Sequence, residues 1–182
     1  MGLDQVARKA NQPGGDANSI DLVKPTPVTL RDTLGFFTTG VTVVTCRGAD
    51  DELLGVTANS FNSVSLDPPL ILFSLARTLN SIDAFRSARN YAINVLGAHQ
   101  RQISEQFASP LADKWADVHA GNSVFDCPVL YDALAVLECE SWRQHDGGDH
   151  IIFVGQVVRI FRNSDHDPLL FYRGDYRDIA PC

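Results

Sequence analysis

The chain has 182 residues, a hydrophobic content of 45% and a formal net charge of −7. This length and hydrophobic content suffice for one domain with a full core, and the negative charge argues against a surface that binds DNA or RNA. No apolar run approaches the roughly 18 residues of a membrane-spanning helix, and we expect no secretory signal at the N-terminus.

Residues 1–27 are rich in Gly, Pro, Asn and Asp and carry no hydrophobic periodicity. We therefore predict a flexible tail, followed by a single domain over residues 28–182. Residues 29–37 predict a short helix that Thr29 caps, with Leu30, Leu34 and Phe37 on its inner face. A β-branched strand over residues 41–46 comes next.

The most distinctive stretch of the chain covers residues 54–71. It begins as a strand, becomes polar from Thr57 to Ser65, and stops at Asp67-Pro68-Pro69 before an apolar strand over residues 70–75. A short polar segment between two buried strands presents hydroxyl, amide and backbone groups that suit the edge of a polar, flat heterocycle. A loop that merely satisfies its own backbone has the same composition, so both interpretations remain open.

A second candidate site lies at the start of the helix predicted after this strand. Asn80 and Ser81 are both good N-cap residues. Together with Arg77 and the Thr78 hydroxyl, the exposed N–H groups of the helix start could bind a phosphate. An ordinary capped helix explains the same residues, and Asp83 in the first turn opposes an anion.

The remainder of the chain alternates strands with short helices. We predict strands over residues 91–96, 134–142, 151–161 and 168–172, helices over 100–108 and 114–118, and a charged turn over 173–177. Asp146-Gly147 is a strong hairpin signal between the two longest strands. About seven strands joined by hairpin signals predict a mainly β, antiparallel fold, a closed or split β-barrel with a few short peripheral helices.

Familiar catalytic and metal-binding motifs are absent from the sequence. It contains no dinucleotide-binding glycine fingerprint, no phosphate-binding loop and no serine nucleophile elbow. His145, Asp146, Asp149 and His150 crowd one turn, which fits a solvated turn better than a metal site, so we predict no metal. The cysteines show no zinc spacing, and we expect reduced thiols in a cytoplasmic protein. They are Cys46, Cys127, Cys139 and Cys182.

Five motifs follow one another between about residues 30 and 176. They are Thr39–Thr45, Gly55–Phe61, Ser63–Pro69, Tyr91–Leu96 and Gly148–His150. In this order and spacing the chain resembles the flavin reductase family of short-chain, FMN-binding split-barrel proteins, the reductase components of two-component flavin-dependent aromatic monooxygenases.

The resemblance implies a split β-barrel that binds FAD or FMN together with NADH. It also implies a homodimer, with some residues acting across the subunit interface, and a separate monooxygenase as partner. It places cofactor contacts at Thr57, Ala58, Asn59 and Ser60 (isoalloxazine edge), Ser63, Val64 and Ser65 (ribityl and phosphate), Ser74, Ala76, Arg77, Asn80 and Ser81 (phosphate), His150 (nicotinamide dinucleotide), and Phe171, Tyr172, Arg173 and Tyr176 (C-terminal segment).

In the mechanism that the resemblance implies, a hydride passes directly from NADH to the flavin, so no catalytic side chain is expected. Backbone N–H groups along residues 57–60 would stabilise the reduced flavin. The reduced flavin would leave for an oxygenase that hydroxylates phenol- or chlorophenol-like compounds. Two alternatives remain: a flavin carrier without catalysis, and an oxidase or heme-linked relative on the same barrel.

Overall fold

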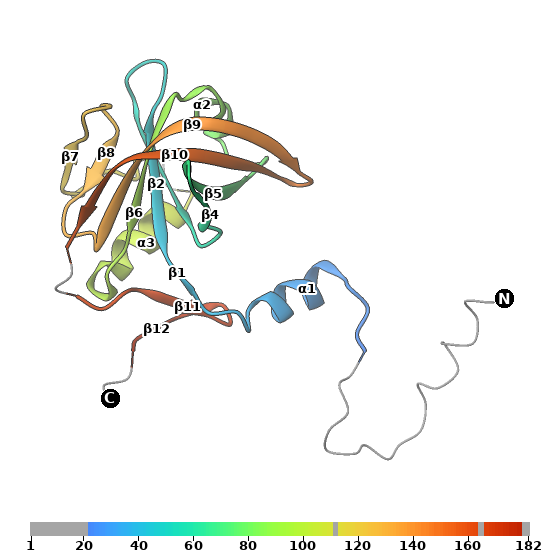
Figure 1. Ribbon diagram of the computed structural model, residues 1–182. Coiled ribbons are helices and arrows are strands. Elements are labelled where there is room, and N and C mark those ends of the chain that lie inside the picture. Colours follow the sequence, from blue (N-terminus) through green and yellow to red (C-terminus); the bar gives the residue numbers. More distant parts are fainter. Residues whose placement is uncertain (1–21, 111–112, 164–165, 180–182) are drawn as a thin grey trace, which may run out of the picture. The chain divides into compact units, whose positions relative to one another are not determined.

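The computed structural model describes residues 22–110, 113–163 and 166–179 (Figure 1). Contacts between residues divide the chain into two units, Met1–Leu34 and Gly35–Cys182. The boundary was predicted at residue 28, and most of the predicted tail, residues 1–27, lies outside the described residues. In the described part of the chain, no helix has the length and apolar character needed to cross a membrane.

Helix α1, Pro27–Leu34, belongs to the first unit. It begins at Pro27, because the fixed φ of proline suits the first helical position. The cap is therefore Thr26, whose Oγ1 accepts a hydrogen bond from the Thr29 N–H at 3.2 Å. The predicted cap at Thr29 was wrong, and Phe37, predicted on the inner face, lies beyond the end of the helix at Leu34.

Seven strands form the main sheet, in the order β3–β2–β6–β9–β10–β5–β4, and all its pairings are antiparallel. The strand bounds are β2 Thr42–Arg47, β3 Leu53–Ala58, β4 Asn62–Leu66, β5 Pro69–Ala76, β6 Asn90–Val95, β9 Ala135–Gly147 and β10 His150–Arg162.

This sheet must curl, because its two edge strands follow each other in the chain. Only residues 59–61 separate β3 from β4. In a flat sheet these edges would lie about 29 Å apart, whereas the four residue steps between them span at most about 14 Å. The sheet therefore closes into a split barrel, and the predicted fold is confirmed.

Smaller elements surround the barrel, and the sequence analysis missed several of them. A three-stranded sheet holds β1 Thr39–Gly40, β11 Leu170–Tyr172 and β12 Asp175–Arg177, and β7 Ala120–Asn122 pairs with β8 Pro128–Leu130. The helices are α2 Ile82–Ser87, η2 Ala98–Gln100 and α3 Arg101–Ala108. The predicted helix over residues 114–118 was wrong, because this segment consists of bends and turns.

The β9–β10 hairpin turns two residues later than predicted. β9 continues to Gly147 and pairs it with His150, so Gly148 and Asp149 form the turn. Gly148 has a φ of 78°. Two-residue hairpin turns require a positive φ at their first position, and glycine adopts it without strain.

Three apolar clusters hold the barrel unit together. Inside the barrel, Phe73 stacks on Phe153 with ring centroids 5.1 Å apart, and Tyr91 meets Phe73 edge-on at 5.3 Å. Outside it, Phe107 of α3 packs over β3 at Gly55, where an added Cβ would lie 2.4 Å from the ring. Glycine at position 55 therefore allows α3 to approach the sheet closely.

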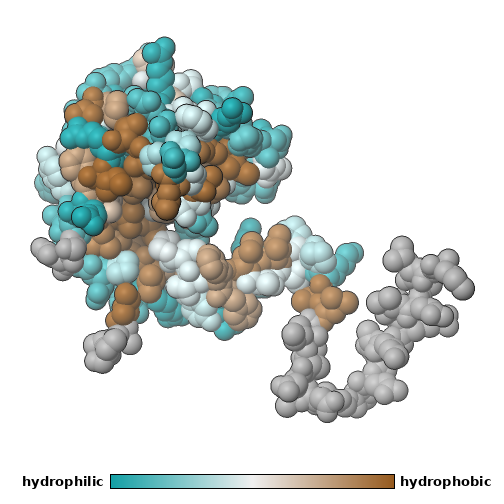
Figure 2. Space-filling model, viewed as in Figure 1, coloured by the Kyte–Doolittle hydropathy of each residue, from teal (hydrophilic) through white to brown (hydrophobic). Residues whose placement is uncertain are grey.

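Apolar side chains also remain exposed on one face of the barrel unit. Figure 2 shows such side chains gathered over β10. In its C-terminal half, Val158, Ile160 and Phe161 are all exposed.

Candidate functional site

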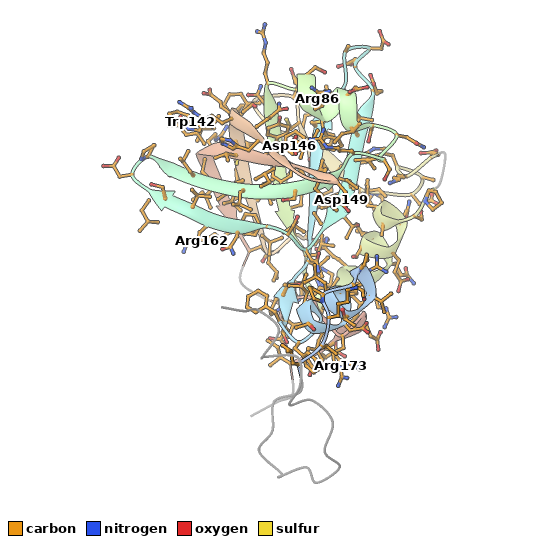
Figure 3. The ribbon with its side chains drawn as sticks, turned by 90° about the vertical axis from the view of Figure 1, so that its right-hand side faces the viewer. Arg86, Trp142, Asp146, Asp149, Arg162 and Arg173 are labelled. Atoms are coloured by element: carbon orange, nitrogen blue, oxygen red, sulfur yellow. The ribbon has the colours of Figure 1, made fainter. Side chains whose placement is uncertain are left out.

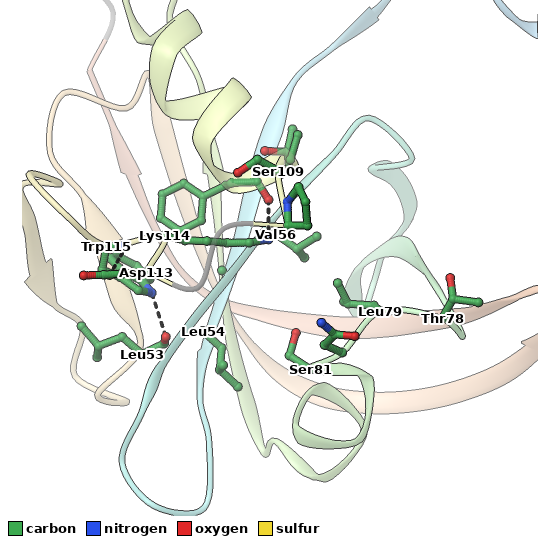
Figure 4. A pocket seen from close by; sticks show the side chains of 16 residues that line it. Leu53, Leu54, Val56, Thr78, Leu79, Ser81, Ser109, Asp113, Lys114 and Trp115 are labelled. Atoms are coloured by element: carbon green, nitrogen blue, oxygen red, sulfur yellow. Dashed lines mark hydrogen bonds between the residues drawn. The ribbon is translucent and has the colours of Figure 1, made fainter.

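Two adjoining cavities lie at the ends of β3 and β5. Their volumes are about 880 and 250 Å³, and both are lined by Val56, Thr57 and Leu79. The larger cavity lies between β3, residues 78–81 before α2, and the segment after α3 (Figure 4). The smaller is lined by residues 56–60, residues 74–76 of β5, and His150. A ligand longer than either cavity can therefore occupy both.

The smaller cavity brings together seven of the predicted cofactor contacts: Thr57, Ala58, Asn59, Ser60, Ser74, Ala76 and His150. Two features of the sheet explain this gathering. The register of β5 against β10 places Ala76 opposite His150. The Ser60 hydroxyl accepts from the Ser74 N–H at 2.9 Å and donates to the Ser74 carbonyl at 3.0 Å, which joins the 59–61 turn to β5.

Two hydroxyls of this cavity wall, those of Thr57 and Ser60, are used within the protein. Thr57 Oγ1 donates to the carbonyl oxygen of Ser104 on α3 at 2.6 Å, and the Ser60 hydroxyl bonds to Ser74. Residues 59–61 lie outside the ladders of β3 and β4. The backbone of this turn is therefore the part of the wall best suited to bind the polar edge of a ligand, as the resemblance implied.

His150 stands at the rim of the smaller cavity, at the start of β10. Its Nδ1 lies 2.7 Å from Asp149 Oδ1, and this hydrogen bond lowers the pKa of the Asp149 carboxyl. Because Asp149 engages Nδ1, the second ring nitrogen, Nε2, is the one left for a ligand. Figure 3 shows Asp149 and Asp146 on the same side of the barrel, at the β9–β10 turn.

Arg77, which was predicted to contact the phosphate, is engaged within the protein. Its Nε donates to the Gly148 carbonyl at 2.8 Å, and its guanidinium pairs with Asp146 at 3.0 Å. The Gly148 N–H and the Arg77 guanidinium lower the pKa of the Asp146 carboxyl. Arg77 lines neither cavity. It follows directly on β5, next to the β9–β10 turn, and so it supports the hairpin that carries His150.

The polar side chains before α2 line the larger cavity, among them the predicted Asn80 and Ser81. Helix α2 begins only at Ile82, and the Ser81 side chain makes no capping hydrogen bond. The predicted side-chain cap was therefore wrong. The Ser81 hydroxyl can instead face a ligand, and Thr78 lies on the same wall (Figure 4).

The opposite wall of the larger cavity was missed by sequence reasoning. Its described part consists of residues 107–110 and residues 113–115, which include Lys114 and Trp115. Trp115 Nε1 donates to the Leu53 carbonyl at 2.7 Å, which ties this segment to β3. An adjacent lysine and tryptophan in a polar segment were the only sequence signal, and the segment was read as a helix.

Two predicted groups line neither cavity of the single chain. Ser63, Val64 and Ser65 lie on β4, an exposed edge strand. Phe171, Tyr172, Arg173 and Tyr176 belong to the separate β1–β11–β12 sheet, where Tyr176 bonds to Ser104 at 2.8 Å. Their contact with a cofactor, within one chain or across a subunit interface, therefore stays a prediction.

The histidines and carboxylates of the hairpin do not assemble a metal site. In the described ranges, no three His, Cys, Asp or Glu side chains are grouped to hold a metal ion. Asp146 pairs with Arg77 and Asp149 with His150, so the hairpin carboxylates already have partners.

Residues 34–180 match the family model described as the flavin reductase like domain. The chain belongs to this family. A flavin-dependent trigonelline monooxygenase reductase component from Acinetobacter baylyi is 42% identical over 147 residues, covering 81% of this chain and 47% of the relative. The chain spans about half the length of the first curated relatives it matches.

Other relatives of this flavin reductase like domain match along most of their length. The flavin-dependent monooxygenase reductase subunit HsaB from Mycobacterium tuberculosis is 38% identical over 157 residues, covering 85% of this chain and 83% of the relative. The crystal structure of the NADH:FAD oxidoreductase SgcE6 from Streptomyces globisporus, in complex with NAD and FAD fragments, superposes with a TM-score of 0.84. It is 38% identical and covers 89% of this chain and 98% of that one.

The residues present fit a flavin. Apolar side chains of Leu54, Val56 and Leu79 flank the two cavities, as a flat aromatic ring system requires. At one end of the joined cavities, residues 59–61 offer backbone groups that take part in no strand pairing, and the Ser81 hydroxyl lies toward the other end. A long cofactor with a heteroaromatic ring at one end and a phosphate at the other matches this arrangement of groups.

Proposed function

We propose that this chain is an NADH-dependent flavin reductase that reduces FAD or FMN and supplies the reduced flavin to a separate oxygenase. The observation that carries the proposal is the pair of joined cavities with His150 at the rim of the smaller one. Support also comes from the family, and from relatives named as reductase components and as an NADH:FAD oxidoreductase.

A bound flavin supplies the redox chemistry, by accepting a hydride from NADH. The protein's part is to bind and orient the two cofactors. The backbone of residues 58–60 would hold the polar edge of the ring and stabilise the charge that reduction places there. His150 would orient the nicotinamide dinucleotide through Nε2, while Asp149 holds the ring through Nδ1. No side chain at the site needs to act as a nucleophile.

The partner and its substrate belong to the same proposal. A reductase that supplies an oxygenase must release its product, which favours a modest affinity, on the order of micromolar. The oxygenase would hydroxylate an aromatic compound of the phenol or chlorophenol kind. Adding a candidate oxygenase and its aromatic substrate to the reductase, NADH and flavin tests this, with hydroxylated product as the readout.

We further propose a cytoplasmic homodimer. The three described cysteines, Cys46, Cys127 and Cys139, are buried free thiols, as a reducing compartment allows. A second copy of the chain would cover the exposed apolar side chains of β10, such as Ile160. Analytical ultracentrifugation should give a dimer that Ile160→Asp converts to monomer, and a monomeric wild type would contradict the dimer.

Steady-state NADH oxidation with added FAD, FMN or riboflavin tests the reductase proposal. We expect His150→Ala to raise the KM for NADH and to leave flavin binding unchanged. His145→Ala is the matched control, because His145 lies exposed on the same hairpin and lines neither cavity.

Each alternative predicts a different result in these assays. A flavin carrier would bind flavin without consuming NADH. An oxidase or heme-linked relative would retain its cofactor stoichiometrically and react with oxygen and a small substrate. If His150→Ala and His145→Ala behave alike, His150 does not contact NADH.

A further inference from the structure

The larger cavity contains a charged side chain to which the proposed reaction gives no role. Lys114 is the one lysine or arginine among the described residues that line either cavity. Its Nζ donates to the Phe107 carbonyl oxygen at 2.8 Å and forms no ion pair with a described carboxylate. An ammonium has three donors, so two remain for a ligand.

Neighbouring hydrogen bonds hold Lys114 at this position. Gln106 Nε2 donates to the Lys114 carbonyl at 3.1 Å, and Trp115 Nε1 donates to the Leu53 carbonyl at 2.7 Å. In Figure 4 the lysine side chain extends from this segment toward Val56 of β3. A cationic side chain that is already fixed in its binding position loses little conformational entropy when an anion binds.

The surroundings of Lys114 favour an anionic ligand. Burial lowers the pKa of the Lys114 ammonium, because the charge loses water without gaining a carboxylate. Across the cavity, the polar side chains of Thr78 and Ser81 carry no charge. The one carboxylate on the lining, Asp113, accepts a hydrogen bond from the Trp115 N–H at 2.9 Å. A phosphate oxygen would replace the lost solvation of the ammonium.

We infer that Lys114 binds the phosphate of the flavin nucleotide and so selects FMN and FAD over riboflavin. The inference rests on the proposed function and names the cation of that same site. Lys114 would then take the phosphate contact that was predicted for Arg77. Arg77 is paired with Asp146 and lines neither cavity, whereas Lys114 lines the larger cavity opposite Thr78 and Ser81.

Fluorescence titration of the full chain with riboflavin, FMN and FAD tests this inference. We expect the wild type to bind both nucleotides more tightly than riboflavin. Lys114→Met removes the charge and keeps the length of the side chain. It should weaken FMN and FAD binding by about ten- to a hundredfold, the usual range for a hydrogen bond to a charged group. Riboflavin binding should not change, which also shows that the variant is folded.

Arg77→Met is the matched control, and it should keep the wild-type preference for FMN over riboflavin. Lys114→Arg should retain part of the preference, and Lys114→Gln replaces Lys114→Met if the latter does not fold. Loss of the preference in Arg77→Met, or its survival in the uncharged Lys114 variant that folds, would overturn the inference. The proposed function fails separately, if the wild type reduces none of the three flavins with NADH.

Discussion

Replacing Ser60 by alanine should loosen the wall of the smaller cavity and destabilise the barrel. Pairing of β5 with β4 ends at Leu72, so the N–H and carbonyl of Ser74 find their partner in the Ser60 hydroxyl instead of a strand. Ser60→Ala removes both bonds, at 2.9 and 3.0 Å. At about 0.5–1.5 kcal/mol for each bond, we expect a loss of about 1–3 kcal/mol in the free energy of unfolding.

Urea unfolding followed by far-UV circular dichroism measures this loss, with an unchanged m-value as the sign of an unaltered unfolded state. Ser63→Ala is the control, because Ser63 is exposed on the edge strand β4, and it should stay within about 0.5 kcal/mol of the wild type. We also expect a higher KM for flavin in Ser60→Ala. If the two variants have equal stability, Ser60 does not hold the 59–61 turn to β5.

Three further predictions concern the rest of the barrel unit. Gly55→Ala would place a Cβ 2.4 Å from the Phe107 ring, so we expect about 1–3 kcal/mol of destabilisation by urea unfolding and weaker FMN binding, and wild-type values for both would refute the clash. Phe153→Ala empties the aromatic stack inside the barrel and should cost about 3–5 kcal/mol in the same assay; a loss under about 1 kcal/mol would contradict the packing. Burial raises the pKa of the Cys127 thiol to about 11 and that of Cys139 to about 12. The folded state keeps these thiols protonated. Their contribution to the free energy of unfolding is therefore complete below the unfolded thiol pKa of about 8.5, and it is lost as the pH rises from there toward the pKa values of the folded state. The urea midpoint should therefore fall between pH 8.5 and 11, and a flat profile would count against buried thiols.

The sequence alone sufficed for the strands whose side chains alternate or are buried on both faces. β5 is an example, since Ile71, Phe73 and Leu75 alternate with less buried neighbours and this pattern is local. β4 gave no such signal, because an exposed edge strand buries no face and is specified by its hydrogen bonds to β5. The same polar residues therefore looked like a loop.

For the candidate site, too, the sequence predicted one part, and the tertiary structure decided another. The order of short motifs indicated the family, and residues 57–60 were proposed as a site because a polar segment between two apolar strands is unusual in any sequence. Which cation faces the larger cavity was decided only by the tertiary structure. Arg77 meets Asp146 through the pairing of β5 with β10, and Lys114 reaches the cavity because Trp115 bonds to β3. These partners are far apart in the chain, so no local pattern could distinguish the two cations.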